Sequence, residues 1–149
     1  MAVNIKSDAF SSEAVKLVEL AIDQLFLEVG RIHKETGKLT DDILSALHSV
    51  FQGSLIPALD LVDRRSITCL TGPSGRYIFQ VIGSSGTPYT CLSTTHYCSC
   101  PAYHYSVLLK EEHLMCKHIL AIRLSQTMGL IKHLEVSDKE IKMAILQMD

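Results

Sequence analysis

Four residues in the second half of the chain are of the types that bind zinc, and they occur as two close pairs: Cys98 with Cys100, and Cys116 with His118. On an extended strand, residues i and i+2 point to the same side, so Cys98 and Cys100 can offer both sulfurs to one ion. Cys116 and His118 can face one ion only from the first turn of a helix, because i and i+2 diverge inside a regular helix. Three thiolates and one imidazole form a closed tetrahedral site. The pattern therefore predicts one structural Zn²⁺ per chain.

Other histidines and cysteines compete with this assignment. His96, His104 and His113 are close enough in sequence to replace the fourth ligand, but none of them shares the position at the start of a helix. Cys69 and Cys91 fall on predicted strands outside the cluster, and we interpret them as small buried apolar side chains. The alternative to a metal site is a set of unrelated core thiols. We also expect the helix N-terminus to favour thiolate over thiol in the cluster.

The first third of the chain predicts helices. Residues 11–32 carry apolar side chains at steps of three and four, which predicts an amphipathic helix, followed by a polar linker over residues 31–39. Thr40 is a predicted N-cap for a second helix, and Ser54 can cap a short continuation. The apolar positions expected to face the core are Leu17, Leu20, Ala21, Leu25 and Val29 in the first helix and Ile43, Leu47, Val50 and Phe51 in the second.

Past residue 63 the hydrophobic period changes to that of strands. Residues 67–71, 76–82 and 89–92 are short, β-branched and aromatic, and Gly-rich and Ser-rich turns separate them. We expect three antiparallel strands, then a short helix near residues 103–110, a helix over residues 117–128 that Gly129 ends, and a last helix. Ser137, with Glu140 three residues later, forms a capping box for that last helix.

The predicted fold class is α+β: N-terminal helices, a small three-stranded antiparallel sheet and a C-terminal helical part held by zinc. The change of pattern divides the chain into an N-terminal helical region, 1–63, and a zinc-binding region with C-terminal helices, 64–149. A chain of 149 residues is short enough for the two to form one compact unit.

Composition restricts the function. The 14 Lys and Arg against 16 Asp and Glu give a net charge of −2, whereas a domain that binds nucleic acid alone usually has a basic excess. Tyr77, Phe79 and Tyr89 are therefore interpreted as core aromatics, and not as base-stacking residues. Arg64 and Arg65 are expected at a solvated strand entry. No signal peptide or membrane-spanning stretch is predicted, so thiols should stay reduced.

Residues 43–59 contain no Asp, Glu, Lys or Arg, although most of them are predicted to be helical. A helix with one face on its own core normally carries charge on the other, and protein interfaces are depleted in charge. We therefore expect a partner-binding face made of small and neutral side chains, whose candidates are Ser45, His48, Ser49 and Gln52. The alternative is a helix buried on all sides within this chain.

The residues CSCPA at 98–102 and CKHILA at 116–121 resemble the SWIM zinc finger family, whose pattern is C-x-C…C-x-H. In that family the motif extends to an alanine three residues past the histidine, which is Ala121 here. A methyl-sized side chain there would let the helix pack closely on a neighbour. The stretch ALDLVDRRSIT at 58–68 extends the resemblance to the SWIM subunits of metazoan Shu complexes, and it covers roughly residues 44–141.

The resemblance implies a nuclear, non-enzymatic scaffold subunit. Its partner would be an ATPase-like protein of the RecA fold, and the pair would help a RecA-class recombinase assemble on single-stranded DNA during homologous recombination. A nucleic-acid-binding zinc finger that acts alone is the main alternative. A metalloenzyme is less favoured, because a catalytic zinc usually keeps one position free of protein ligands, and here four ligands are predicted.

Overall fold

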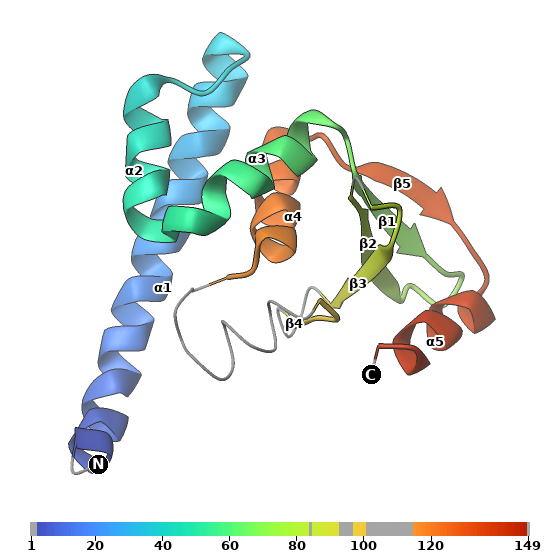
Figure 1. The fold of residues 1–149 in the computed structure, drawn as a ribbon, viewed down its shortest axis with the longest axis horizontal. Coiled ribbons are helices and arrows are strands. Elements are labelled where there is room, and N and C mark those ends of the chain that lie inside the picture. The colour runs from blue at the N-terminus through green and yellow to red at the C-terminus, as the bar shows by residue number, and fades with distance from the viewer. Residues whose placement is uncertain (1–2, 84, 93–96, 101–114, 149) are drawn as a thin grey trace.

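The computed structural model describes residues 3–83, 85–92, 97–100 and 115–148. The N-terminal part is helical: α1 spans Val3–Thr36, α2 Asp41–Phe51, the short 3₁₀ helix η1 Gln52–Ser54, and α3 Leu55–Asp63. Among the described residues, five strands and two helices follow. The strands are β1 (Ile67–Thr71), β2 (Tyr77–Ile82), β3 (Pro88–Leu92), β4 (Tyr97–Cys98) and β5 (Lys132–Glu135), and the helices are α4 (Lys117–Met128) and α5 (Asp138–Leu146). The α+β class is as predicted (Figure 1).

Helix α1 spans Val3–Thr36 and is therefore longer than the predicted residues 11–32. The prediction that a linker begins at Arg31 is wrong, because Arg31 lies within this helix. Arg31 instead forms ion pairs along the helix with Glu28 and Glu35, and the chain leaves the helix at Gly37, where φ is +76°. The predicted apolar face is also partly wrong. Leu17 and Leu20 are exposed, whereas the buried positions are Ile22, Phe26 and Val29. Two apolar stripes run along this helix, and periodicity alone did not distinguish the one that faces the core.

Caps explain where the next helices begin. The Thr40 hydroxyl accepts a hydrogen bond from the Ile43 N–H at 3.4 Å, as predicted for an N-cap. The capping role predicted for Ser54 is wrong, because its side chain makes no bond to the first turn of α3. Its hydroxyl instead donates to the carbonyl of Met115 at 3.2 Å. That bond joins the helical part of the chain to the residue before Cys116.

The sheet has five strands in the order β4-β3-β2-β1-β5. The predicted antiparallel pairs β1–β2 and β2–β3 are present, but three strands was an underestimate. β4 adds an antiparallel edge of two residues, and β5 pairs parallel to β1 at the other edge. Neither edge strand has the alternating apolar pattern that identifies strands in sequence: β4 is too short, and all four residues of β5 are exposed.

Helix α4 begins and ends where predicted, and α5 begins where predicted but ends at Leu146, before Met148. Helix α4 covers Lys117–Met128 and stops at Gly129 in the left-handed conformation, with φ +70°. The Ser137 hydroxyl accepts from the Glu140 N–H at 3.1 Å and caps α5. The short helix predicted near residues 103–110 lies outside the described residues. Among the described residues, no helix has both the length and the apolar character needed to cross a bilayer.

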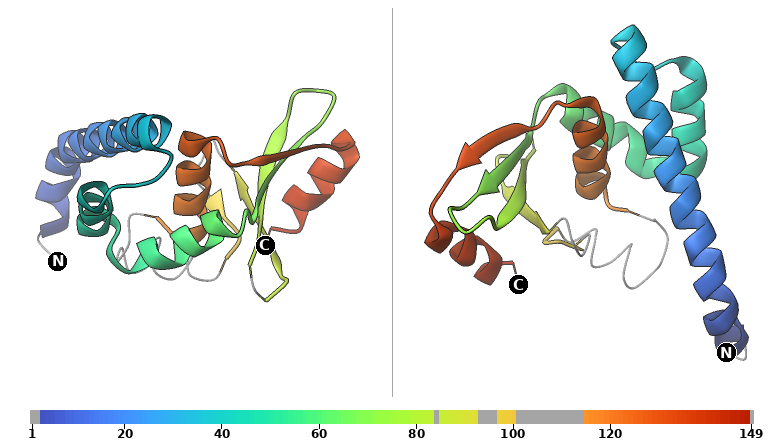
Figure 2. Two further views of the ribbon diagram at one scale, coloured as in Figure 1. Left: turned by 90° about the horizontal axis from the view of Figure 1, so that it is seen from above. Right: turned by 180° about the vertical axis from the view of Figure 1, so that it is seen from behind.

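Helix α4 lies at the centre of the molecule, with α1 and α3 on one side and the sheet on the other (Figures 1 and 2). Leu120 and Leu124 of α4 are completely buried in one core that contains residues from both 1–63 and 64–149. Gly30 of α1 suits this close packing, because a Cβ there would lie 3.0 Å from Thr127 Cγ2. On the other face of the sheet, Ile141 of α5 covers Leu70 and Ile78 in a second, small cluster.

Candidate metal centre

The structure brings the four predicted zinc ligands together where the sheet meets α4. Cys98 ends β4 and Cys100 follows it, while Cys116 is the N-cap of α4 and His118 lies in its first turn. All four side chains are buried, and one ligand atom from each lies within 4.8 Å of the others. The strand-end and helix-start positions are those predicted from the spacing.

The geometry suits tetrahedral zinc. Cys98 Sγ and His118 Nδ1 are 3.7 Å apart. Ligand bonds of about 2.3 Å for sulfur and about 2.0–2.1 Å for nitrogen, at a tetrahedral angle, place the two atoms about 3.6 Å apart. Three sulfurs and one nitrogen form the donor set of structural zinc sites, which carry four protein ligands. The cluster therefore fits Zn²⁺ in both its donor atoms and its spacing.

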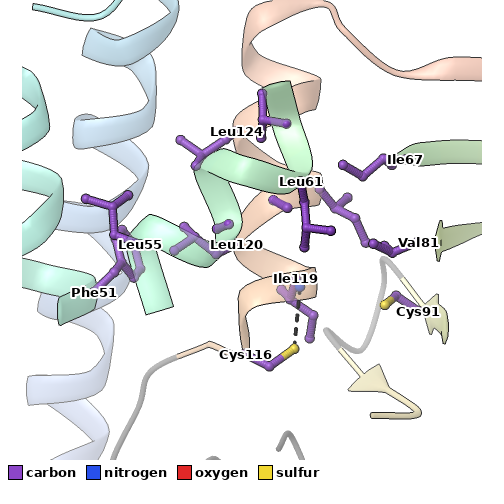
Figure 3. Packing of buried hydrophobic residues seen from close by; sticks show 14 of the residues in the cluster. Phe51, Leu55, Leu61, Ile67, Val81, Cys91, Cys116, Ile119, Leu120 and Leu124 are labelled. Carbon is purple, nitrogen blue, oxygen red and sulfur yellow. Dashed lines mark hydrogen bonds between the residues drawn. The ribbon is translucent and has the colours of Figure 1, made fainter. Parts of the chain in front are cut away.

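Neighbouring backbone bonds hold both ligand pairs in place. The Cys116 sulfur accepts from the Ile119 N–H at 3.4 Å, so this ligand also caps α4 (Figure 3). Ser99, between Cys98 and Cys100, donates its N–H to the Thr90 carbonyl at 3.0 Å and accepts the Thr90 N–H on its hydroxyl at 3.1 Å. Cys98 and Cys100 are thereby fixed to β3, and Cys116 is fixed to α4.

Crowding of the thiols controls the protonation of the metal-free site. The neighbouring Cys100 thiol is the main cause of the raised pKa of Cys98. Cys100 is also the main cause of the raised pKa of Cys116, and the Cys98 thiol and burial raise that pKa further. This direction is opposite to our expectation that the helix N-terminus would favour thiolate. Hydrogen bonds among the crowded thiols, together with burial, favour the protonated form and outweigh the helix dipole. A divalent cation supplies the positive charge that the cluster needs to ionise.

Tyr89 contacts the site in a way that sequence reasoning missed. Its ring lies 4.6 Å from the imidazole of His118, with the two planes inclined by 37°, so that it restricts the orientation of this ligand. We had interpreted Tyr89 as a core aromatic, and it is half-buried. No sequence signal marked it, because the contact depends on how β3 packs against α4. Ala121, one turn past His118, is completely buried in the core.

The other predicted residues have mixed outcomes. Cys69, Cys91 and Phe79 are buried, as expected. Tyr77 is not a core residue, because 46% of it is exposed and its ring packs edge-on against Phe79. Arg64 is exposed and pairs with Asp60 at 3.2 Å, and Arg65 is also exposed. His96, His104 and His113, the competing ligands, lie outside the described residues.

Comparison with known proteins agrees with this geometry. The sequence profile of the SWIM zinc finger matches residues 81–124, which contain all four ligands. Zinc finger SWIM domain-containing protein 7 of Mus musculus is 48% identical over 86% of this chain and 84% of its own length. The chain belongs to the SWIM zinc finger family. The protein of the same name from Danio rerio is 49% identical over 84% of this chain and 89% of its own length. The zinc finger SWIM domain-containing protein 7 homolog of Dictyostelium discoideum is 33% identical over 78% of this chain and 76% of its own length. The zinc site of this SWIM finger thus lies within a larger α+β fold.

Proposed function

We propose that this chain is a non-enzymatic scaffold subunit of a Shu-type complex in the nucleus. In this proposal it pairs with an ATPase-like protein of the RecA fold. The pair supports homologous recombination and DNA repair by promoting assembly of a RecA-class recombinase on single-stranded DNA. Two observations support membership of such a complex: the family assignment, and the resemblance of residues 44–141 to SWIM subunits of Shu complexes. The proposed contact face rests on α2.

The outer face of α2 is the observation that carries the proposal. Ser45, His48, Ser49 and Gln52 are all exposed, so the alternative of a helix buried on all sides within this chain does not apply to them. Ile56, at the start of α3, adds a side chain that is 68% exposed. Residues 43–59 contain no charged side chain. An exposed, uncharged surface that includes a large apolar group is inexpensive to desolvate, as the centre of a protein interface must be.

The zinc site has a structural role in this proposal. With four protein ligands it has no position for a water nucleophile, so we expect no hydrolase activity. Zinc holds β4 and the start of α4 together, and α4 packs against α3, which follows the proposed contact face. The net charge of −2 favours contact with DNA through the complex over binding by this chain alone.

Co-purification with the RecA-fold partner tests the proposal. Ser49→Glu and Ile56→Glu each place a charge on the contact face and should abolish co-purification, while zinc content and melting temperature stay unchanged. Ser85→Glu is the matched control, because Ser85 is exposed in the turn before β3, far from α2 in sequence. Normal partner binding by both α2–α3 variants would show that the contact face lies elsewhere.

The alternative, a zinc finger that binds nucleic acid alone, is tested with the purified chain and labelled single-stranded DNA. The scaffold proposal predicts little binding at physiological salt. Tight binding whose affinity falls steeply with added salt would favour the alternative, because such a slope reports neutralised phosphates.

A further inference from the structure

Cys91 lies directly opposite Cys98, one of the four zinc ligands. The two residues are partners in the antiparallel register of β3 and β4. Both side chains are about 1% exposed. Cys91 is outside the four-residue ligand cluster, which has three sulfurs, so its thiol is a fourth sulfur beside the site.

The hydrogen bonds around this pair bring its side chains close together. The Ser99 N–H donates to the Thr90 carbonyl at 3.0 Å, so backbone bonds flank Cys91 and Cys98 and do not join them. Such non-hydrogen-bonded pairs have Cα atoms about 4.5 Å apart and the closest side chains in an antiparallel sheet. That separation lies within the range of about 4.4–6.8 Å that a disulfide requires.

The side chains are also oriented toward each other. The pKa of Cys98 is raised mainly by the Cys100 thiol, and the Cys91 thiol adds to this rise, so the side chains of Cys91 and Cys98 are close enough to interact. Figure 3 shows the Cys91 sulfur turned from β3 toward α4, on the side where Cys116 lies. Cys69 belongs to the same row across the sheet, but Phe79 of β2 lies between it and Cys91. Two strand spacings are about 10 Å, too far for a disulfide.

A cavity borders Cys91. Cys91 lines a space of about 180 Å³ together with Phe79 and Ile119. The exposed Asp23 and Gln126 belong to the same wall, so the cavity reaches the surface. One water needs only about 10–15 Å³ measured in this way, so a molecule the size of hydrogen peroxide fits.

We propose that Cys91 and Cys98 form a redox pair that couples oxidation by a peroxide to release of zinc. The sulfur of Cys91 attacks one peroxide oxygen, the O–O bond breaks, and the thiol becomes a sulfenic acid with loss of one water. The Cys98 thiolate then attacks the Cys91 sulfur. An S–S bond forms, the S–O bond breaks, and the departing hydroxide takes a proton and leaves as a second water. Peroxide is reduced to two waters, and two thiols are oxidised to one disulfide.

The disulfide removes Cys98 as a thiolate ligand and leaves three residues at the site. Zinc affinity falls because the bonded sulfur no longer carries the charge that the ion needs. A thiol reductant cleaves the disulfide and restores the ligand, so the change is reversible. Cys91 takes part in this process without being a zinc ligand.

The full-length, zinc-loaded chain tests the proposal. After treatment with hydrogen peroxide, free thiols are alkylated, the chain is digested, and disulfides are identified by mass spectrometry, while a chromophoric chelator reports released zinc. We expect a Cys91–Cys98 disulfide that forms in step with zinc release, and reductant plus zinc should restore the starting state. Disulfides confined to Cys98, Cys100 and Cys116 would overturn the proposal.

Variants separate the roles of the two buried strand cysteines. Cys91→Ala should keep zinc under reducing conditions but release it roughly fivefold more slowly in peroxide, since the first oxidation step is lost. Cys69→Ala, the matched control, should release zinc at the wild-type rate. An unchanged rate in Cys91→Ala would also overturn the proposal. Cys91→Ser replaces Cys91→Ala if the latter does not fold, and the disulfide map of the wild-type chain decides if neither variant does.

Discussion

The hydroxyl of Ser54 donates a hydrogen bond to the backbone carbonyl of Met115 at 3.2 Å, across 61 residues of sequence. Ser54 ends η1 and is only 7% exposed. Met115 directly precedes Cys116, the ligand that caps α4. The position of the second ligand pair is thus fixed partly by the helical region, and not by zinc alone.

Ser54→Ala should therefore destabilise the fold and loosen the zinc site. Removing the donor leaves the Met115 carbonyl without this partner, which costs about 1–3 kcal/mol when the group is buried. Met115 is only half-buried, so we expect a loss near the lower end of this range in denaturant unfolding, together with faster transfer of zinc to a chelator. Ser49→Ala is the control, because its hydroxyl bonds only to the Ser45 carbonyl on an exposed helix face. Equal stabilities of the two variants would contradict a structural role for the bond.

Metal content is the second prediction. The purified chain should hold one zinc, and Cys100→Ser or His118→Ala should lose it. Structural zinc contributes about 10–16 kcal/mol in zinc-finger peptides, whereas whole domains are stable by only about 5–15 kcal/mol. Loss of the ion should therefore unfold the region from the strands to α4. Elemental analysis and thermal melting measure both effects.

His133→Ala is the matched control for the histidine ligand, because His133 is exposed on the edge strand β5. It should keep both zinc and the wild-type melting temperature. A His118→Ala chain with full zinc content and normal melting would remove His118 from the ligand set.

The zinc ligands, the starts of α2 and α5, the bounds of α4 and the first three antiparallel strands could be predicted because each depends on local sequence. The i, i+2 spacing of Cys98 and Cys100 places two sulfurs on one side of a strand, and Thr40 and Ser137 cap helices by bonding within their own first turns. These features require no knowledge of what packs against them.

The errors concern features that depend on tertiary packing. Whether Leu20 or Ile22 of α1 faces the core depends on where α4 lies, and β5 is a strand because β1 offers it hydrogen bonds. Tyr77 has the residue type of a core aromatic, but it lies at the end of β2 and is partly exposed. The bond from Ser54 to Met115 is equally non-local.

Zinc affinity should fall as pH falls. The pKa values of Cys98 and Cys116 are raised in the metal-free fold, so both thiols carry protons at neutral pH, and zinc binding must displace them. Each displaced proton changes the apparent affinity about tenfold per pH unit, so these two together predict about 100-fold per unit. Chelator competition between about pH 6 and pH 8 measures the slope. A flat profile would mean that the ligands are already ionised before the metal binds.

The last prediction concerns Gln52, which combines a strained backbone with a place on the proposed contact face. Its φ of 49° and ψ of −124° lie in a region that side-chain-bearing residues rarely adopt, and strain of this kind costs about 1–3 kcal/mol. Gln52→Gly should therefore stabilise the chain by about 1 kcal/mol, after the larger entropy loss of glycine on folding is subtracted. Gln52→Ala removes the same side chain but keeps the strain, so it should give no such gain. Denaturant unfolding of the two variants measures the difference.

Co-purification with the proposed RecA-fold partner then tests whether the strain serves binding. If it presents the Gln52 side chain to the partner, both variants should bind more weakly, although only the glycine variant is more stable. Stability and binding would then change in opposite directions in Gln52→Gly. Wild-type binding by both variants would instead assign the strain to the turn between α2 and α3, and would leave Ser49 and Ile56 to carry the proposed contact.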